Sequence, residues 1–319
     1  MDSIIIDGIA FTLPLFIIAI GGIYSERSGI VNLALEGLLG VGAFSGALAA
    51  ILLKDHLAPN SPWIFIVALL CSMLGAALYA SLHALLCIRF RANQVISGVV
   101  INILAAALTA FLTSQLNKLL FDQPSDKFIL GSLPRWDLPV LSKIPILGAA
   151  FSRIYPFVPI MIVLAIIAWY VLYHSRFGMH LRAAGDNPHA LAAAGISVSK
   201  VRFLAVIISG ALSGIGGIAF AYSISAQFSP SIYVGFGYLS IAALIFGNWR
   251  IPQTLFACVI FGFARSGGYE LVRQLGLPAA YSDLILILPY VLTLFLLLFF
   301  SSSNRAPRAL GIIYDKGAR

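Results

Sequence analysis

Charged residues are scarce in this sequence of 319 residues: Asp, Glu, Lys and Arg make up 10% of it, whereas hydrophobic residues make up 60%. A soluble domain usually carries about 25% charged residues, and a chain of this size cannot hide so much apolar surface from water. Apolar stretches of about 18 residues or more, long enough to cross a bilayer as a helix, recur along the chain. The composition excludes a soluble fold and predicts an all-α polytopic membrane protein.

Cysteine is rare as well, and motifs of catalysis are missing. Cys71, Cys87 and Cys258 lie in apolar stretches without the spacing of a metal site, so we interpret them as packing residues. The sequence contains no Gly-Lys-Ser or Gly-Lys-Thr phosphate loop, no Gly-x-Ser-x-Gly elbow and no His-Glu-x-x-His pair. We therefore predict that the chain is not an enzyme and binds no metal or cofactor, and that any ATP and Mg²⁺ are bound by a separate subunit.

The net charge is +8, and the basic residues that produce it are distributed as in a membrane protein. Lys and Arg stand at the ends of apolar runs and form no basic face with interleaved aromatic residues, so nucleic acid is not an expected partner. Asp2 and Asp7 open the chain where a signal peptide would carry basic residues. We expect the first apolar run to be kept as a spanning helix.

Windows of about twenty apolar residues, bounded by charged and turn residues, predict the helical segments. They cover residues 4–23, 29–53, 62–88, 95–117, 156–174, 201–223, 236–248, 252–270 and 281–300. The segment 236–248 is too short for a simple span. With 252–270 it is predicted to form a broken or re-entrant hairpin, which is tolerated only where protein or water covers the exposed backbone. We expect about eight to ten transmembrane helices in all.

Basic residues gather on alternate connections, and this asymmetry predicts the orientation. One side collects Arg27, Arg89, Arg91, Arg176, Arg182, Lys200, Arg202, Arg250, Arg305, Arg308, Lys316 and Arg319. The acidic residues on that side are Glu26, Asp186 and Asp315. The positive-inside rule makes this side cytoplasmic, with the N-terminus outside and the C-terminus inside.

The chain reads as one transmembrane domain, residues 1–319, with three segments outside the bilayer. The connection 118–155 is long, rich in proline and external, so we expect either a contact surface for an external partner or a lid over helix ends. The connection 176–200 and the tail 301–319 are predicted to be cytoplasmic. We find no internal repeat in the sequence.

A short helix is specified inside the cytoplasmic connection. Asn187, or Asp186 before it, can accept a hydrogen bond from the free N–H groups of the first turn, and Pro188 suits the first helical position. Gly195 can adopt the left-handed conformation that ends a helix. The rod is about 10 Å long and would be marginal alone, so it needs a partner.

The exposed face of this helix is expected to carry small side chains. Ala190, Ala193 and Ala194 would let another surface approach closely. The alternative is an ordinary capped connection between two membrane helices.

The same loop resembles the cytoplasmic coupling motif of ATP-binding-cassette (ABC) importer permeases, written Glu-Ala-Ala, three residues, then Gly. His189, Ala190 and Leu191 occupy the triplet here and Gly195 keeps the spacing, although the Glu and the second Ala are missing. The longer string 183–196 is similar to the loop of simple-sugar and nucleoside permeases, which share a wider family with branched-chain amino-acid permeases. The resemblance implies contact with the ATPase at Gly185, Asp186, Asn187, Pro188, His189, Ala190, Ala193 and Gly195.

A second string, Glu26 to Gly37, reads Glu-Arg-Ser-Gly-Ile-Val-Asn-Leu-Ala-Leu-Glu-Gly. It resembles the shorter of the two unlike permeases that pair in nucleoside importers. The resemblance implies a multi-pass permease of the inner (plasma) membrane, paired as a heterodimer with a second, paralogous permease. It also implies an ABC ATPase subunit, an external substrate-binding lipoprotein and transport by alternating access, with nucleosides preferred over simple sugars and branched-chain amino acids.

Four polar residues within the predicted spans are candidates for the substrate path: Asn32, Glu36, Ser97 and Asn102. A charged group at membrane depth must face protein or water, which makes Glu36 a functional candidate. Its alternative role is to fix helix packing by accepting hydrogen bonds from backbone donors at a helix break. For Ser97 and Asn102 the alternative is hydrogen bonding between helices.

Two further groups lie near the external ends of spans. Arg265, Glu270 and Arg273 are expected to form an interfacial ion network, or else the rim of the translocation path. The aromatic residues are interpreted as an interfacial belt, with stacking on a nucleobase as the alternative: Tyr222, Phe228, Tyr233 and Phe236.

Two other classes of function compete with the importer hypothesis. An ion-coupled secondary transporter would use Glu36 as its proton-coupling residue. A membrane-embedded enzyme, such as a lipid-modifying transferase, would need several polar or acidic residues clustered at one interface, and the sequence offers no such cluster.

Overall fold

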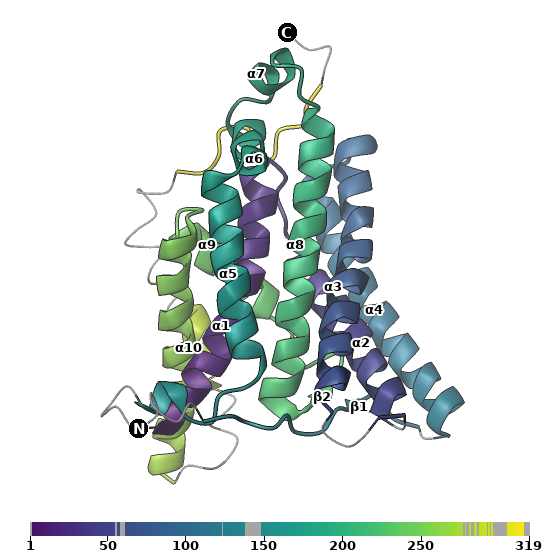
Figure 1. Ribbon diagram of the computed structural model, residues 1–319, viewed down its shortest axis with the longest axis vertical. Helices are drawn as coiled ribbons and strands as arrows, with labels where there is room; N and C mark the ends of the chain where they lie inside the picture. Colours follow the sequence, from purple (N-terminus) through teal and green to yellow (C-terminus); the bar gives the residue numbers. More distant parts are fainter. Residues whose placement is uncertain are drawn as a thin grey trace.

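The apolar runs fold into an upright bundle of helices in a computed structural model of the chain (Figure 1). The structure describes residues 2–54, 56–57, 61–122, 124–137, 148–276 and 305–315, with some residues between 278 and 295. Among these residues seven helices are long and apolar enough to cross a membrane. The predicted all-α polytopic membrane fold is therefore confirmed, and the two termini lie at opposite ends of the bundle.

The helices in chain order are α1 (Asp2–Arg27), α2 (Leu35–Lys54), α3 (Pro62–Ala84), α4 (Gln94–Phe121), α5 (Phe157–His174), α6 (Arg176–Asp186), α7 (Pro188–Ala193), α8 (Val198–Phe220), α9 (Phe236–Phe246) and α10 (Ile251–Gln274). Helices α3 and α8 continue as π-helical turns, Leu85–Arg89 and Ala221–Ser225. A short 3₁₀ turn covers Gly148–Phe151. The predicted segments 62–88, 95–117, 156–174 and 201–223 correspond closely to α3, α4, α5 and α8. Half of the ninth predicted segment, 281–300, lies outside the described residues, and the described half is helical.

The end of the bundle opposite α7 is closed in part by a two-stranded antiparallel sheet. Strand β1 (Phe128–Ile129) pairs with β2 (Gln227–Phe228), so Phe128 faces Phe228 across the pair. Both phenylalanines are fully buried, and their rings lie 5.9 and 5.8 Å from the ring of Phe44 on α2. The described start of the connection 118–155 is thus anchored over helix ends by aromatic packing.

Helix α8 is the centre of the bundle, and it approaches α1, α2 and α3 closely because small residues lie at these contacts. The hydroxyl of Ser72 on α3 donates to the carbonyl of Gly214 on α8. A Cβ atom added at Gly217 would overlap the carbonyl of Leu39 on α2. Packing therefore accounts for the glycines of α8 without any ligand.

Gly217→Ala is expected to lower the midpoint of thermal unfolding by several degrees, because overpacking a close helix contact costs about 1–3 kcal/mol. The matched control is Gly267→Ala on α10, where no atom lies within 4 Å of the added Cβ. Alanine is the better helix former, so this control should be neutral or slightly stabilising. Thermal unfolding of the purified protein in detergent measures both, and equal midpoints would show that α2 and α8 are not in close contact.

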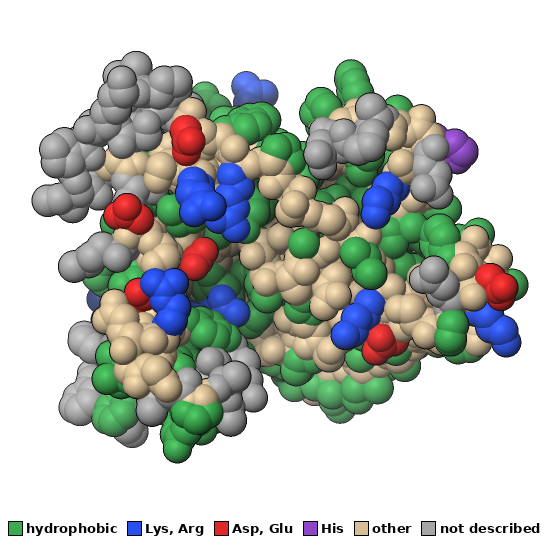
Figure 2. Space-filling model, turned by 90° about the horizontal axis from the view of Figure 1, so that it is seen from below, with side chains coloured by type: hydrophobic (Ala, Val, Ile, Leu, Met, Phe, Trp, Pro, Cys, Tyr) green, Lys and Arg blue, Asp and Glu red, His purple; other side chains and the backbone are tan. Residues whose placement is uncertain are grey.

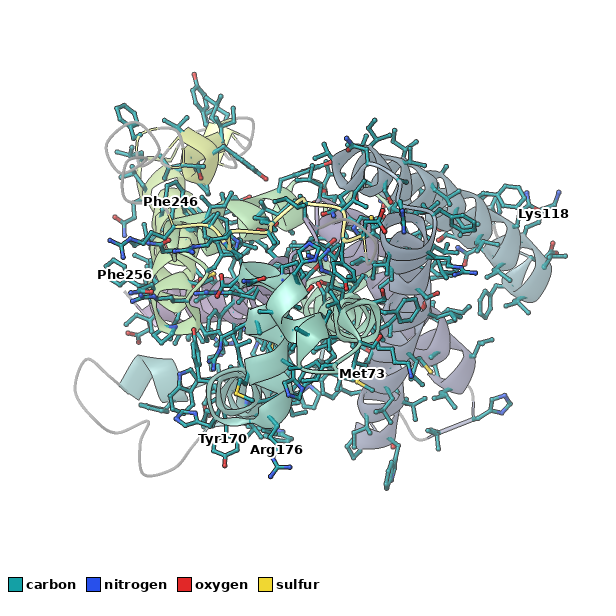
Figure 3. All side chains as sticks on the ribbon, turned by 90° about the horizontal axis from the view of Figure 1, so that it is seen from above. Met73, Lys118, Tyr170, Arg176, Phe246 and Phe256 are labelled. Atoms are coloured by element: carbon teal, nitrogen blue, oxygen red, sulfur yellow. The ribbon has the colours of Figure 1, made fainter. Side chains whose placement is uncertain are left out.

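Lipid-facing surface is found on the outer helices. The side chain of Phe256 on α10 is 68% exposed and that of Tyr170 on α5 is 59% exposed. Seen from the α7 end, both rings point outward at the edge of the bundle (Figure 3). Helix α4 leans away from the other helices and places Lys118 at the far edge. Such exposed apolar side chains are stable in hydrocarbon and not in water.

Two helices begin inside the bundle instead of at its ends. Helix α2 starts at Leu35, so the prediction that this span begins at residue 29 is wrong: residues 28–34 run as turns and extended chain. Helix α9 has only 11 residues and follows turns at 230–235. A tight turn at 247–250 joins it to α10, which confirms the predicted broken hairpin.

Candidate functional site

The first turns of α2 and α9 meet within the bundle, and Glu36 joins them. Its Oε1 accepts a hydrogen bond from the N–H of Gly235, and its Oε2 accepts one from the N–H of Gly237 at 2.6 Å. The Glu36 residue is 8% exposed. A carboxylate at this place satisfies free donors of the α9 terminus and favourably opposes the positive end of the helix dipole. Glu36 therefore has the alternative role foreseen for it, as an acceptor for backbone donors at a helix break.

Side chains from α3 and α4 satisfy the backbone of the extended segment 28–34. The N–H of Val31 donates to Oε1 of Gln94 at 2.7 Å. Nε2 of His83 lies 3.2 Å from the carbonyl oxygen of Val31, and its Nδ1 lies 2.9 Å from the hydroxyl of Ser97. Non-helical backbone at membrane depth needs such partners, because hydrocarbon supplies none.

Asn102 on α4 serves the start of α2 with both ends of its amide. Its Oδ1 accepts from the N–H of Gly37 at 2.8 Å, and its Nδ2 donates to the carbonyl of Leu33 at 2.7 Å. The same Nδ2 lies 3.1 Å from the hydroxyl of Tyr238 on α9. Asn102 thus links α4 to α2 and α9, the two helices that begin inside the bundle and are called the interrupted helices below.

Asn32 retains an unused acceptor. Its Nδ2 donates to Ser209 on α8 at 2.8 Å, whereas its buried Oδ1 has no hydrogen-bond partner among the described residues. Its N–H donates to Glu26 Oε1 at 3.4 Å, and Oε2 of Glu26 accepts from the indole of Trp249 at 2.5 Å. Glu26 and Trp249 were not singled out as site residues from the sequence, because their pairing joins the end of α1 to the distant turn before α10.

The four predicted substrate-path residues lie in two places. Glu36 and Asn102 belong to the crossing of α2 and α9. Asn32 ties the extended segment to Ser209 on α8, and Ser97 contacts His83, which in turn contacts the segment. All four are at most 9% exposed, and most of their hydrogen-bonding groups are used within the chain. Contact with substrate stays a prediction for these residues.

Helix α6 fills much of the connection 176–200, and the sequence analysis missed it. The hydroxyl of Ser175 accepts from the N–H of Gly178 at 3.0 Å and so caps its first turn. Leu181, Ala184 and Gly185 form its buried face. The signal was present in Ser175, a preferred N-cap residue, followed by good helix formers.

Helix α7 has the local structure that its sequence predicts. Oδ1 of Asn187 accepts from the N–H of Ala190 at 3.0 Å, and Pro188 is its first residue. Gly195 follows the helix with φ of 80°, a conformation that favours glycine. Pro188 and Leu191 are buried, whereas the small residues are exposed at the tip of the molecule: Ala190, Ala193, Ala194 and Gly195.

Gly185 fastens this end to the bundle, while the adjacent Asp186 is exposed. A Cβ atom added at Gly185 would overlap the carbonyl of Arg27, the last residue of α1. The carbonyl of Gly185 also accepts from the N–H of Ala309 at 2.7 Å. Helix α6 therefore sits directly on the end of α1, with no flexible side chain between them.

Arg202 on α8 makes a second set of contacts that hold α6 and the neighbouring segments to the bundle. Its guanidinium donates to the carbonyls of Ser28 at 3.0 Å, Ala184 at 3.2 Å and Ile312 at 3.0 Å. The residue is only 2% exposed. Carbonyl groups at the C-terminal ends of α1 and α6 stabilise a buried cation. Four segments of the chain are joined at this one side chain.

The C-terminal segment 305–315 crosses this end of the bundle beside α6 (Figure 1). Asp315 pairs with Arg91 before α4 at 3.1 Å, and the ring of Tyr314 lies 5.4 Å from the ring of His189 on α7. The segment thus touches both α7 and the start of α4. The remaining tail residues, 316–319, lie outside the described residues.

The residues predicted to lie near the external ends of spans are arranged differently from expectation. Glu270 and Arg273 do pair, at 3.0 Å, but the guanidinium of Arg265 lies over aromatic rings instead of joining that pair. The aromatic belt interpretation is wrong, because all four rings are buried at 8% exposure or less: Tyr222, Phe228, Tyr233 and Phe236. Among the described residues no group of His, Cys, Asp or Glu is placed to hold a metal ion.

Helices that begin inside the bundle and are held by buried polar side chains, with membrane-length helices around them, are typical of multi-pass membrane transport proteins. The family model for the permease component of branched-chain amino acid transport systems matches residues 4–297, and the chain belongs to this family. It is therefore a transport subunit of the inner (plasma) membrane.

The matched relatives extend over nearly the whole chain. The guanosine ABC transporter permease protein NupQ of Bacillus subtilis strain 168 is 38% identical over 322 residues, covering 99% of this chain and 98% of the relative. The nucleoside ABC transporter permease protein NupC of Lactococcus lactis subsp. cremoris strain MG1363 is 36% identical, with the same coverage. The guanosine ABC transporter permease protein NupP of Bacillus subtilis strain 168 is 26% identical over 92% of this chain and 80% of its own length. No solved structure matches this chain.

Proposed function

We propose that this chain is one of two permease subunits of an ABC importer and that it carries nucleosides across the membrane by alternating access. The observation that carries the proposal is the 38% identity to a guanosine permease over 99% of this chain. The interrupted helices support it, because broken helices near the bilayer midplane are where transporters place their moving and binding elements.

The second permease is proposed to be a paralogue that forms a heterodimer with this chain. Two permease proteins of one organism, NupQ and NupP, are both similar to this sequence, one strongly and the other more distantly. This chain covers 98% of NupQ but 80% of NupP, which supports its role as the shorter member of such a pair.

The ATPase is proposed to bind at α7. Its exposed face of alanines and glycine offers a shallow surface that another protein can approach closely, and the resemblance to the coupling motif lies on these residues. Basic residues gather at the same end, which favours a cytoplasmic location by the positive-inside rule. ATP and Mg²⁺ would be held by that partner, and an external lipoprotein would deliver the nucleoside to the opposite end.

A mechanical route leads from α7 to the interrupted helices. Displacement of α7 reaches α6, which rests on the end of α1 through Gly185, and reaches α8 through Arg202. The extended segment 28–34 starts at the same place, since Ser28 is a second partner of Arg202. A push at the tip is therefore transmitted to the segment that positions α2 and Glu36.

The experiment is uptake of radiolabelled guanosine by proteoliposomes that contain both permeases and the ATPase, with the lipoprotein outside and ATP inside. Uptake is expected only when all components and ATP are present. The rival, an ion-coupled transporter, predicts counterflow by this chain alone in liposomes, and such counterflow would overturn the proposal.

A further inference from the structure

Two adjoining cavities open at the end of the bundle opposite α7. They have volumes of about 250 and 370 Å³ and share the wall residues Phe11, Ile224, Arg265 and Tyr269. Seen from this end, the surface is hollowed between two parts of the molecule, with basic and acidic side chains beside the hollow (Figure 2). Together the cavities reach the size of a small-molecule site.

Arg265 stands in the shared wall with its guanidinium over three aromatic rings. The guanidinium carbon lies 4.5 Å from the ring centre of Phe11, 5.0 Å from that of Tyr269 and 5.9 Å from that of Phe236. Within the described part of the chain it is in no ion pair, although Asp7 lines the same cavity. Aromatic faces hold a guanidinium in place by cation–π attraction, and Tyr269 adds a side-chain hydrogen bond, while Nε is left without a partner among the described residues.

Two buried polar atoms of this cavity lack a hydrogen-bond partner among the described residues: Nε of Arg265 and Oγ of Ser223. Buried polar groups in native proteins nearly always have a hydrogen-bond partner. Two atoms without one in the same cavity therefore indicate that another molecule binds there. The missing partner must offer acceptors to the guanidinium.

The cavity is also next to the helix crossing. Val234 and Phe236 line it, and Gly235 between them donates its N–H to Glu36. A molecule in the cavity therefore contacts the first turn of α9, the element that Glu36 ties to α2. Occupancy at this point can be sensed by the interrupted helices.

We propose that this cavity is the external substrate site and that it holds a nucleobase, with Arg265 donating to acceptors on the edge of the base. A base presents a flat ring for the aromatic walls and hydrogen-bonding atoms on its edge. The guanidinium fork matches O6 and N7 of guanine, whereas adenine places an amino donor beside N7 and fits worse. The inference rests on the proposed function, which names nucleosides but no residue that binds them.

The test compares guanosine and adenosine uptake by the complete importer carrying Arg265→Gln or Arg273→Gln. Arg273 is the matched control: it lies on the same helix, pairs with Glu270, and its side chain is 73% exposed. Arg265→Gln is expected to lower guanosine uptake at least tenfold and adenosine uptake less, so that the preference for guanosine falls. Arg273→Gln should stay within twofold of the wild type for both.

Two results would overturn the site. One is Arg265→Gln behaving like Arg273→Gln, and the other is an equal loss of both nucleosides at normal membrane levels. If Arg265→Gln fails to assemble, Tyr269→Leu and Tyr269→Phe replace it: loss in the first with retention in the second supports the ring contact, and equal behaviour contradicts it. A wild-type importer that carries neither nucleoside would instead refute the proposed function.

Discussion

Ala193→Arg is expected to abolish nucleoside-stimulated ATP hydrolysis by the assembled importer. Ala193 is exposed on α7 with Ala190, and a long cationic side chain there would hold the ATPase surface several ångströms away. The buried side of the helix, Pro188 and Leu191, is untouched, so the permease should fold and insert normally. ATP hydrolysis with and without nucleoside-loaded lipoprotein measures the effect.

The control at the same position is Ala193→Ser, which stays small and should leave stimulation near that of the wild type. Amounts of each variant in the membrane, and co-purification with the second permease, separate a coupling defect from a folding defect. Wild-type transport by Ala193→Arg would remove α7 from the ATPase interface.

Glu36→Ala is expected to cost about 2–6 kcal/mol of stability and to stop transport. The substitution leaves the N–H groups of Gly235 and Gly237 without acceptors in an apolar interior, and each such loss costs about 1–3 kcal/mol. With its cap removed, the first turn of α9 is no longer fixed to α2. Thermal unfolding in detergent and guanosine uptake measure the two effects.

Glu36→Gln separates the capping role from proton coupling. Glutamine keeps one carbonyl acceptor but cannot titrate, so an intermediate unfolding midpoint with retained ATP-driven uptake is expected. Complete loss of uptake at near wild-type stability would contradict the capping role and favour the ion-coupled transporter.

Hydrophobic length was sufficient to find most spans, but it misplaced the start of α2. Apolar residues such as Ile30, Val31 and Leu33 can lie in extended chain or in a helix. Hydrophobicity alone therefore does not distinguish the two conformations. The difference lies in partners far along the chain, because Gln94 and Asn102 supply the hydrogen bonds that make extended backbone tolerable.

Local signals predicted α7 well because Asn187, Pro188 and Gly195 act within a few residues of one another. The fastening of this end could not be predicted, since Arg202 binds carbonyl groups, which every residue carries. The side-chain sequence does not show which backbone carbonyl will lie nearest to a given arginine.

The aromatic residues at the end of the bundle opposite α7 show a further reason why the site could not be predicted in full. The sequence around Phe236 is the same whether its ring faces lipid or a cavity. Only the fold shows that the ring lies beside Arg265. The predicted ion pair likewise forms between Glu270 and Arg273, whereas Arg265 lies over an aromatic ring, and the sequence did not distinguish the two cases.

The extended segment 28–34 also constrains how the protein folds. The N–H of Val31 donates to Gln94 and the carbonyl of Leu33 accepts from Asn102, and these partners lie 63 and 69 positions later on α4. A second span released alone into the bilayer would carry bare peptide groups into hydrocarbon, which costs several kcal/mol for each group. The backbone of this segment therefore obtains these hydrogen bonds only when α4 has packed against the start of α2.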